Sequence, residues 1–87
     1  MEYLIDGKLF STNTSKQVAQ FIHYSHGPIE CVYLSPKGVY WIGWERTNNG
    51  TAKVISKKQA MEFCIQHHGT NSYRFKEFFS LSELEQG

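Results

Sequence analysis

The chain has 87 residues, which suits one domain and leaves no room for a second core. Nine Lys and Arg residues against eight Asp and Glu residues give a formal net charge of +1. This balance argues against a general nucleic-acid binder, which usually has a basic excess, and against a DNA mimic, which needs a strongly acidic surface. The aromatic residues (six Phe, five Tyr and two Trp) exceed what one small core obviously needs, and they suggest a binding surface.

The expected location is the cytoplasm. The N-terminus lacks an apolar run behind a basic start, and no stretch approaches the roughly 18 apolar residues of a membrane span. We therefore expect neither a signal peptide nor a membrane partner. In that compartment Cys31 and Cys64 are expected to be reduced and buried rather than paired.

The first elements are predicted from a turn and a cap. Asp6-Gly7 lies between two short apolar stretches and predicts a type I′ β-hairpin, because both central positions of that turn need positive φ. The sequence from Thr14 to Gln17 matches a capping box and is followed by apolar residues at helical spacing. We therefore predict a helix that begins at Thr14 and ends at Gly27.

The centre of the chain is predicted to be extended. Residues 29–34, 39–46 and 51–55 are rich in β-branched and aromatic side chains, which is typical of strands. A turn at 35–38 and the Asn49-Gly50 pair would join them into antiparallel hairpins.

A second helix is predicted from another capping box, Ser56 to Gln59, and it would end at Gly69. Residues 73–79 alternate aromatic and charged side chains and are expected to form a last strand. Residues 80–87 would be a tail.

The two predicted helices align without a gap, and each follows a hairpin turn. This predicts two similar β-hairpin–helix halves, at about 1–28 and 38–70, within a single domain of residues 1–87. The expected fold class is α+β, with a mostly antiparallel sheet of five to six strands in the order β-β-α-β-β-β-α-β. Both helices are expected on one face of the sheet.

A binding surface is predicted from strand alternation. With Pro36-Lys37 as the loop centre, Leu34 would face Val39, so that Ile29, Cys31, Tyr33, Tyr40, Ile42, Trp44 and Ile55 share one face. The opposite face, centred on Trp41, is expected to be partly solvated and to bind a partner or a second copy of the chain. The predicted partner-binding residues are Trp41, Val39, Val32, Leu34, Glu30, Glu45 and Lys37. Alternatively, the tail folds over Trp41 and nothing binds there.

Metal binding and catalysis have less support. Cys64-x-x-His67-His68 and His23-x-x-His26 have spacings that zinc sites use, but no Cys-x-x-Cys knuckle accompanies them. The helix dipole explains histidines in a last helical turn. No paired carboxylates, phosphate-binding Gly-rich loop or nucleophile motif is present. We expect a non-enzymatic protein without metal or cofactor.

Nucleic-acid binding is the main alternative. Single strands stack on aromatic sheet platforms that also carry basic residues. The residues that could form such a platform are Tyr40, Trp41, Trp44, Arg46, Tyr73, Arg74 and Phe75. Strand alternation places several of these rings in the core, and the net charge offers little attraction to phosphates.

The segment from Cys31 to Trp41, CVYLSPKGVYW, followed by ISKKQAMEF from Ile55 to Phe63, resembles small phage- and plasmid-encoded accessory proteins. Some proteins of that kind are anti-defence factors, including anti-CRISPR inhibitors. The resemblance implies a non-enzymatic inhibitor that occupies a surface of a host protein or nucleoprotein complex. It carries over no functional residue. A structural homodimer or an adaptor would have the same sequence features.

Overall fold

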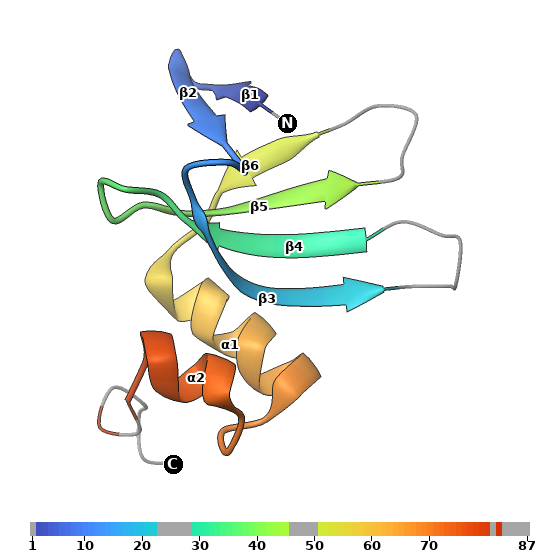
Figure 1. Ribbon diagram of the computed structural model, residues 1–87, viewed down its shortest axis with the longest axis vertical. Helices are drawn as coiled ribbons and strands as arrows, with labels where there is room; N and C mark the ends of the chain where they lie inside the picture. The colour runs from blue at the N-terminus through green and yellow to red at the C-terminus, as the bar shows by residue number, and fades with distance from the viewer. Residues whose placement is uncertain (1, 23–28, 46–50, 81, 83–87) are drawn as a thin grey trace.

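The computed structural model describes residues 2–22, 29–45, 51–80 and 82, and in this part of the chain six strands precede two helices (Figure 1). The strands are β1 (Glu2–Ile5), β2 (Lys8–Ser11), β3 (Lys16–Ile22), β4 (Ile29–Leu34), β5 (Tyr40–Glu45) and β6 (Ala52–Val54). The helices are α1 (Lys57–His68) and α2 (Tyr73–Phe78).

The strands form two antiparallel sheets. Strands β3, β4, β5 and β6 make a four-stranded sheet in that order, and β1 pairs only with β2 in a separate hairpin. The two helices pack on one face of the larger sheet, and the hairpin packs on the other face. The α+β class, the antiparallel pairing and the two helices on one face are confirmed, although the six strands are divided between two sheets.

Several local predictions are also confirmed. Asp6 and Gly7 have φ angles of 51° and 77°, as a type I′ turn requires, and this turn pairs Tyr3 with Phe10. Ser56 caps α1: its side chain accepts a hydrogen bond from Gln59 N–H, and the Gln59 side chain accepts one from the Ser56 N–H.

Two predicted elements are wrong in type. The segment predicted to be the first helix forms strand β3 from Lys16 to Ile22. A turn precedes this strand, and in it Ser15 N–H donates to the Ser11 carbonyl at 3.1 Å. A β-bulge between Gln17 and Ala19 lets the adjacent residues Val18 and Ala19 both enter the core, whereas Phe21 and Ile22 further along the strand are exposed.

The expected last strand is helix α2. The Ser72 side chain accepts a hydrogen bond from Phe75 N–H and caps this helix, and Phe75 and Phe79, one turn apart, are both buried. Since residues 16–22 are extended and the aligned residues of α1 are helical, the prediction of two similar β-hairpin–helix halves is wrong.

The turn between β4 and β5 decides which side chains share a face. Gly38 has a φ of 82°, its N–H donates to the Ser35 carbonyl, and Ser35 N–H donates to the Val39 carbonyl, both at 2.9 Å. Leu34 therefore pairs with Tyr40 and not with Val39. This shift of one residue exchanges the two faces of β4 relative to β5, so the predicted face assignment is wrong for β4.

The larger sheet is therefore covered on both sides. On the helix side, the buried residues are Val18, Ala19, Val32, Ile42, Ala60, Met61, Cys64, Phe75 and Phe79. On the hairpin side they are Tyr3, Phe10, Ile29, Cys31, Tyr33 and Trp41. The two cysteines are not joined in a disulfide, and they lie in different clusters on opposite sides of the sheet.

Helix α1 also covers the outer edge of β3. The backbone N–H of Gln20 donates to Nε2 of His68 at 3.2 Å, and the ring of Phe21 stacks on His67 with centroids 4.3 Å apart. A partner for an edge amide reduces the risk of pairing with another chain. Both histidines of α1 therefore have structural contacts.

Candidate binding site

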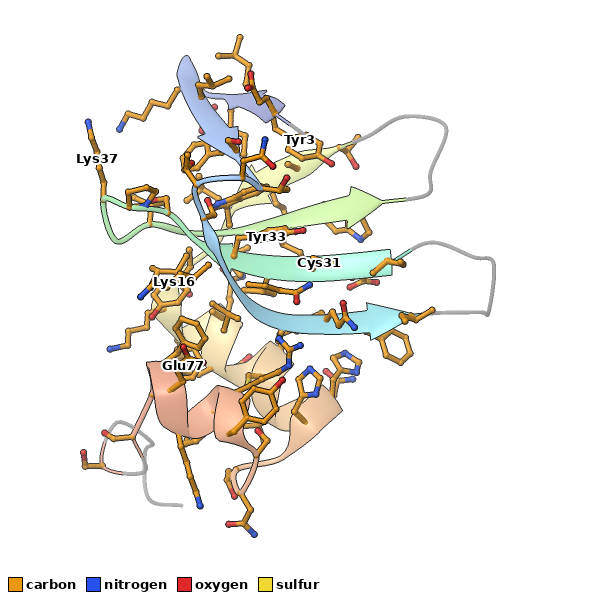
Figure 2. All side chains as sticks on the ribbon, viewed as in Figure 1. Tyr3, Lys16, Cys31, Tyr33, Lys37 and Glu77 are labelled. Carbon is orange, nitrogen blue, oxygen red and sulfur yellow. The ribbon has the colours of Figure 1, made fainter. Side chains whose placement is uncertain are left out.

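The face predicted to bind a partner is closed by the N-terminal hairpin. Trp41 has no exposed surface, and its ring contacts Tyr3 and Phe10 of the hairpin, with centroids 5.6 and 5.7 Å away, and stacks on Tyr33 at 4.5 Å. Figure 2 labels Tyr3 beside β6 and Tyr33 between β5 and β4, and both residues belong to the buried cluster on the hairpin side. The prediction of a partly solvated patch centred on Trp41 is therefore wrong, because Tyr3 and Phe10 supply the apolar cover that this face needs.

The seven predicted partner-binding residues are not brought together. Val32 is fully buried on the helix side, and Leu34 packs against the same helix-side cluster. Glu30 lies half-buried on β4, and the side chain of Glu45 lies outside the described residues. Among the predicted residues whose side chains the structure describes, Lys37 and Val39 alone share a surface feature, which is a pocket beside the hairpin.

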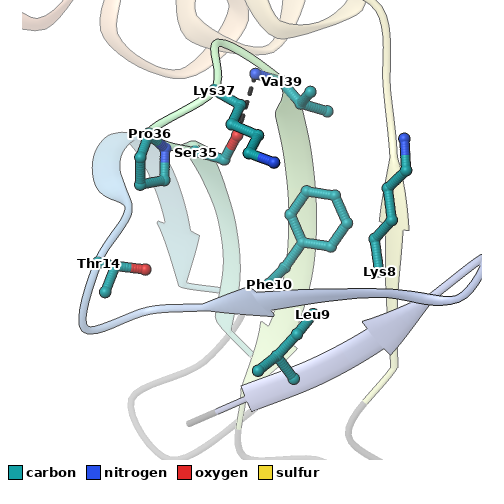
Figure 3. Close-up of a pocket in the computed structure, with 8 residues that line it drawn as sticks. All are labelled: Lys8, Leu9, Phe10, Thr14, Ser35, Pro36, Lys37 and Val39. Carbon is teal, nitrogen blue, oxygen red and sulfur yellow. Dashed lines mark hydrogen bonds between the residues drawn. The ribbon is translucent and has the colours of Figure 1, made fainter.

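This pocket has a volume of about 430 Å³ and lies between the hairpin and the turn that joins β4 to β5 (Figure 3). Its lining comes from strand β2, the segment that leads into β3, and the turn: Lys8, Leu9, Phe10, Thr14, Ser35, Pro36, Lys37 and Val39. Phe10, Pro36 and Val39 give it apolar walls. The Ser35 hydroxyl accepts a hydrogen bond from Val39 N–H at 3.1 Å, which holds the turn in shape.

Two lysines give the pocket a positive charge. Figure 3 shows the side chains of Lys8 and Lys37 on either side of the Phe10 ring. Both lysines are exposed, and none of the eight lining residues is a carboxylate. Two ammonium groups near an apolar wall favour an anion that has an apolar part.

The same hairpin presents an apolar surface to solvent. Leu4 pairs with Leu9 across the strands, and their side chains are 75% and 66% exposed. Because side chains alternate along a strand, these leucines point away from Tyr3 and Phe10, which are buried against Trp41. We call the pocket lining together with Leu4 the hairpin site; Leu9 belongs to both parts.

A sequence signal for the hairpin site was present. The Asp6-Gly7 turn sets the pairing of Leu4 with Leu9 and of Tyr3 with Phe10. Because these two apolar pairs are on opposite faces of the hairpin, burial of one pair in a core leaves the other pair on the outer face. The pocket itself depends on how the hairpin packs against the turn at 35–39, and the sequence carries no signal for that packing.

The alternative aromatic platform is dispersed. Trp41 and Phe75 are buried, and Tyr40 stacks on Phe79 inside the helix-side cluster. Nζ of Lys53 lies 5.9 Å from the ring centroid of Trp44, and Cζ of Arg74 lies 5.6 Å from the ring centroid of Tyr73. These two pairs are separate, because Trp44 belongs to β5 and Tyr73 to α2. Arg46 lies outside the described residues.

The histidines and cysteines form no metal site in the part of the chain that is described, where no three His, Cys, Asp or Glu side chains are grouped to hold an ion. Cys64 is buried, and burial raises the pKa of its thiol, although Arg74 and Ser72 oppose that shift. A thiol with a raised pKa is a poor nucleophile. His23 and His26 lie outside the described residues.

Comparisons with protein families, with characterised proteins and with solved structures found no match to this chain. Among the described residues, neither helix has the length and apolar character needed to cross a membrane.

Proposed function

We propose that this chain is a non-enzymatic module that binds a partner protein through the hairpin site. The observation that carries the proposal is the exposed Leu4–Leu9 pair on the outer face of a hairpin whose strand β2 also lines a pocket with apolar walls and two lysines. An exposed apolar patch with a charged rim is typical of protein interaction sites. The lining contributes hydroxyl and ammonium groups but no His, Cys or carboxylate to act as a general base, and this composition favours binding over catalysis.

The rigidity of the hairpin supports this role. Its inner side chains, Tyr3 and Phe10, are anchored on Trp41, so the outer leucines are held in place without a partner. A preorganised surface loses less conformational entropy on binding than a loose one. The hairpin site therefore has the properties of a preformed docking surface.

The partner is a host protein or nucleoprotein complex in this proposal. The resemblance of residues 31–41 and 55–63 to anti-defence accessory proteins favours a host defence complex of the CRISPR–Cas type, which the chain would inhibit by occupying a surface. That partner belongs to the proposal and rests on the resemblance alone. The binding surface rests on Leu4, Leu9 and the pocket.

The proposal is tested with a variant that places two charges on the outer face, Leu4→Glu/Leu9→Glu. Val54→Glu is the control for a single charge at an exposed apolar position away from the site, since Val54 is 43% exposed on a strand of the other sheet. Circular dichroism and urea unfolding establish that both variants fold. Wild type, variant and control are then used to capture partners from a host lysate, and any captured protein is purified and titrated.

We expect one partner to bind wild type and Val54→Glu alike, and to bind the double variant at least about tenfold more weakly, since charges at an apolar docking surface are desolvated without a counter-charge. Equal binding by all three proteins would refute the proposed site. If light scattering instead showed that wild type is a dimer and that the double variant is a monomer, the surface would be a homodimer contact and the proposal of a separate partner would fail.

A further inference from the structure

We infer that the pocket of the hairpin site recognises an acidic segment of the partner: an apolar side chain enters between Phe10, Pro36 and Val39, while neighbouring carboxylates pair with Lys8 and Lys37. This inference rests on the proposed function and specifies the chemistry of its partner. It is carried by the apolar walls and the two ammonium groups, which converge on one pocket from separate parts of the chain.

The pocket is large enough for such a segment. Sites that hold drug-sized ligands are typically about 300–1,000 Å³, and this pocket has about 430 Å³. An apolar anchor buried in a pocket is the usual energetic centre of a protein interface. Leu9 lines the pocket and also belongs to the outer face of the hairpin, opposite Phe10. A ligand that contacts both the pocket and the Leu4–Leu9 pair has to cross strand β2, which favours a polypeptide over a small free anion.

The charged residues that line the pocket are both lysines, although the whole chain carries a formal net charge of only +1. Lys8 and Lys37 come from β2 and from the turn at 35–39, and the hairpin's own carboxylates, Glu2 and Asp6, do not line the pocket. Carboxylates of a partner would neutralise the two lysines, and they would also steer the encounter.

Nucleic acid fits the pocket less well. Binding of single strands needs open aromatic faces for stacking and a long basic groove. The aromatic ring in the lining is Phe10, which is only 6% exposed and is already in contact with Trp41. Two lysines neutralise two phosphates at most, which is a small fraction of what tight binding requires.

The experiment is a peptide-display selection on the wild-type protein, with counter-selection on Lys8→Glu/Lys37→Glu. The control, Lys16→Glu/Lys58→Glu, has the same change in net charge at exposed positions outside the pocket. We expect enriched peptides to carry Asp or Glu within two positions of a large apolar residue. We also expect the charge-reversed double variant, but not the control, to bind them at least tenfold more weakly by fluorescence anisotropy.

Two further arms separate charge from shape. Lysine-substituted forms of the enriched peptides should regain binding to Lys8→Glu/Lys37→Glu, because the sign of both partners is reversed. Thr14→Trp places a large ring at an exposed position of the lining and keeps both lysines, and it should weaken the original peptides at least tenfold.

Failure of this inference is distinguishable from failure of the proposed function. If the enriched peptides lack acidic residues and depend on Leu4 and Leu9 but not on the lysines, the acidic-segment inference is overturned and the protein-binding role remains. If no peptide is enriched and no partner is captured, both fail. Binding to vesicles with phosphatidylserine but not to phosphatidylcholine vesicles, with no peptide bound, would overturn the inference in favour of a membrane surface.

Discussion

The indole N–H of Trp41 donates a 3.1 Å hydrogen bond to the hydroxyl of Ser15, which joins the centre of the four-stranded sheet to the segment between the hairpin and β3. Trp41 is fully buried, so Ser15 supplies the partner that a buried indole N–H needs.

Ser15→Ala should therefore destabilise the protein by about 1–3 kcal/mol, since it leaves a buried donor without an acceptor. Urea unfolding followed by circular dichroism measures this change. Ser15→Thr retains the hydroxyl and should cost less. If Ser15→Ala cost less than about 0.5 kcal/mol, the bond would contribute little to stability.

The hairpin offers a comparison between two adjacent residues of β2 with opposite orientations. Phe10→Ala removes a buried ring that contacts Trp41 and should cost about 3–5 kcal/mol. Leu9→Ala changes a side chain that is 66% exposed and should stay within about 0.5 kcal/mol. Equal effects of the two variants on the free energy of unfolding would contradict the packing of the hairpin on the sheet.

His68 should make stability depend on pH. Burial lowers the pKa of His68 below its ordinary value of about 6.5, and electrostatic interactions with Arg74 and His67 lower it further. The lone pair of Nε2 that accepts from Gln20 N–H is available only in the neutral ring. Because the pKa is lower in the folded state, the contribution of His68 to stability is fully present above about pH 6.5 and is lost as the pH falls through the folded-state value.

The comparison is between wild type and His68→Gln, whose amide oxygen accepts the same hydrogen bond without titrating. We expect wild type to lose more free energy of unfolding than His68→Gln between about pH 7.5 and 5.5. Identical losses, or a pKa above about 6.5 for His68 by NMR, would contradict the prediction.

Gly38 holds the turn that sets the register of β4 against β5. Its φ of 82° is in the left-handed region, so Gly38→Ala should cost about 1–2 kcal/mol even though a methyl group would meet no neighbouring atom. Gly38→Asn should cost less, because Asn tolerates this conformation better. Thermal unfolding distinguishes the two, since 1 kcal/mol shifts Tm by about 4–8 °C in a domain of this size.

The elements that could be predicted from the sequence are those stabilised by interactions between residues close together in the chain. The Asp6-Gly7 turn and the Ser56 cap were predictable because the interactions that make them are complete within a few residues. The segment from Thr14 has comparable local signals, but burial of Val18 and Ala19 beside β4 favours a strand with a bulge. Tertiary packing overrides a local propensity of a few tenths of a kcal/mol per residue.

The candidate site was missed for a related reason. The predicted pairing of β4 with β5 differs by one residue from the observed pairing, so the wrong face of β4 was assigned to the helices. The covering of Trp41 by the hairpin was also not predicted. Lys37 and Val39 were identified as binding residues, but for a surface centred on Trp41. The structure instead groups them with Lys8 and Phe10, more than twenty-five positions earlier in the sequence.

The placement of the two cysteines on opposite sides of the sheet provides an internal reporter for each covering layer. Cys31 is buried between the sheet and the hairpin, Cys64 is a residue of α1 buried on the helix side, and neither thiol is in a disulfide. A thiol reagent reaches a buried sulfur only when the structure above it opens, so labelling rates measure local opening free energies. Single-cysteine variants would therefore show whether the hairpin detaches on its own, which is motion that a partner bound at the hairpin site would suppress.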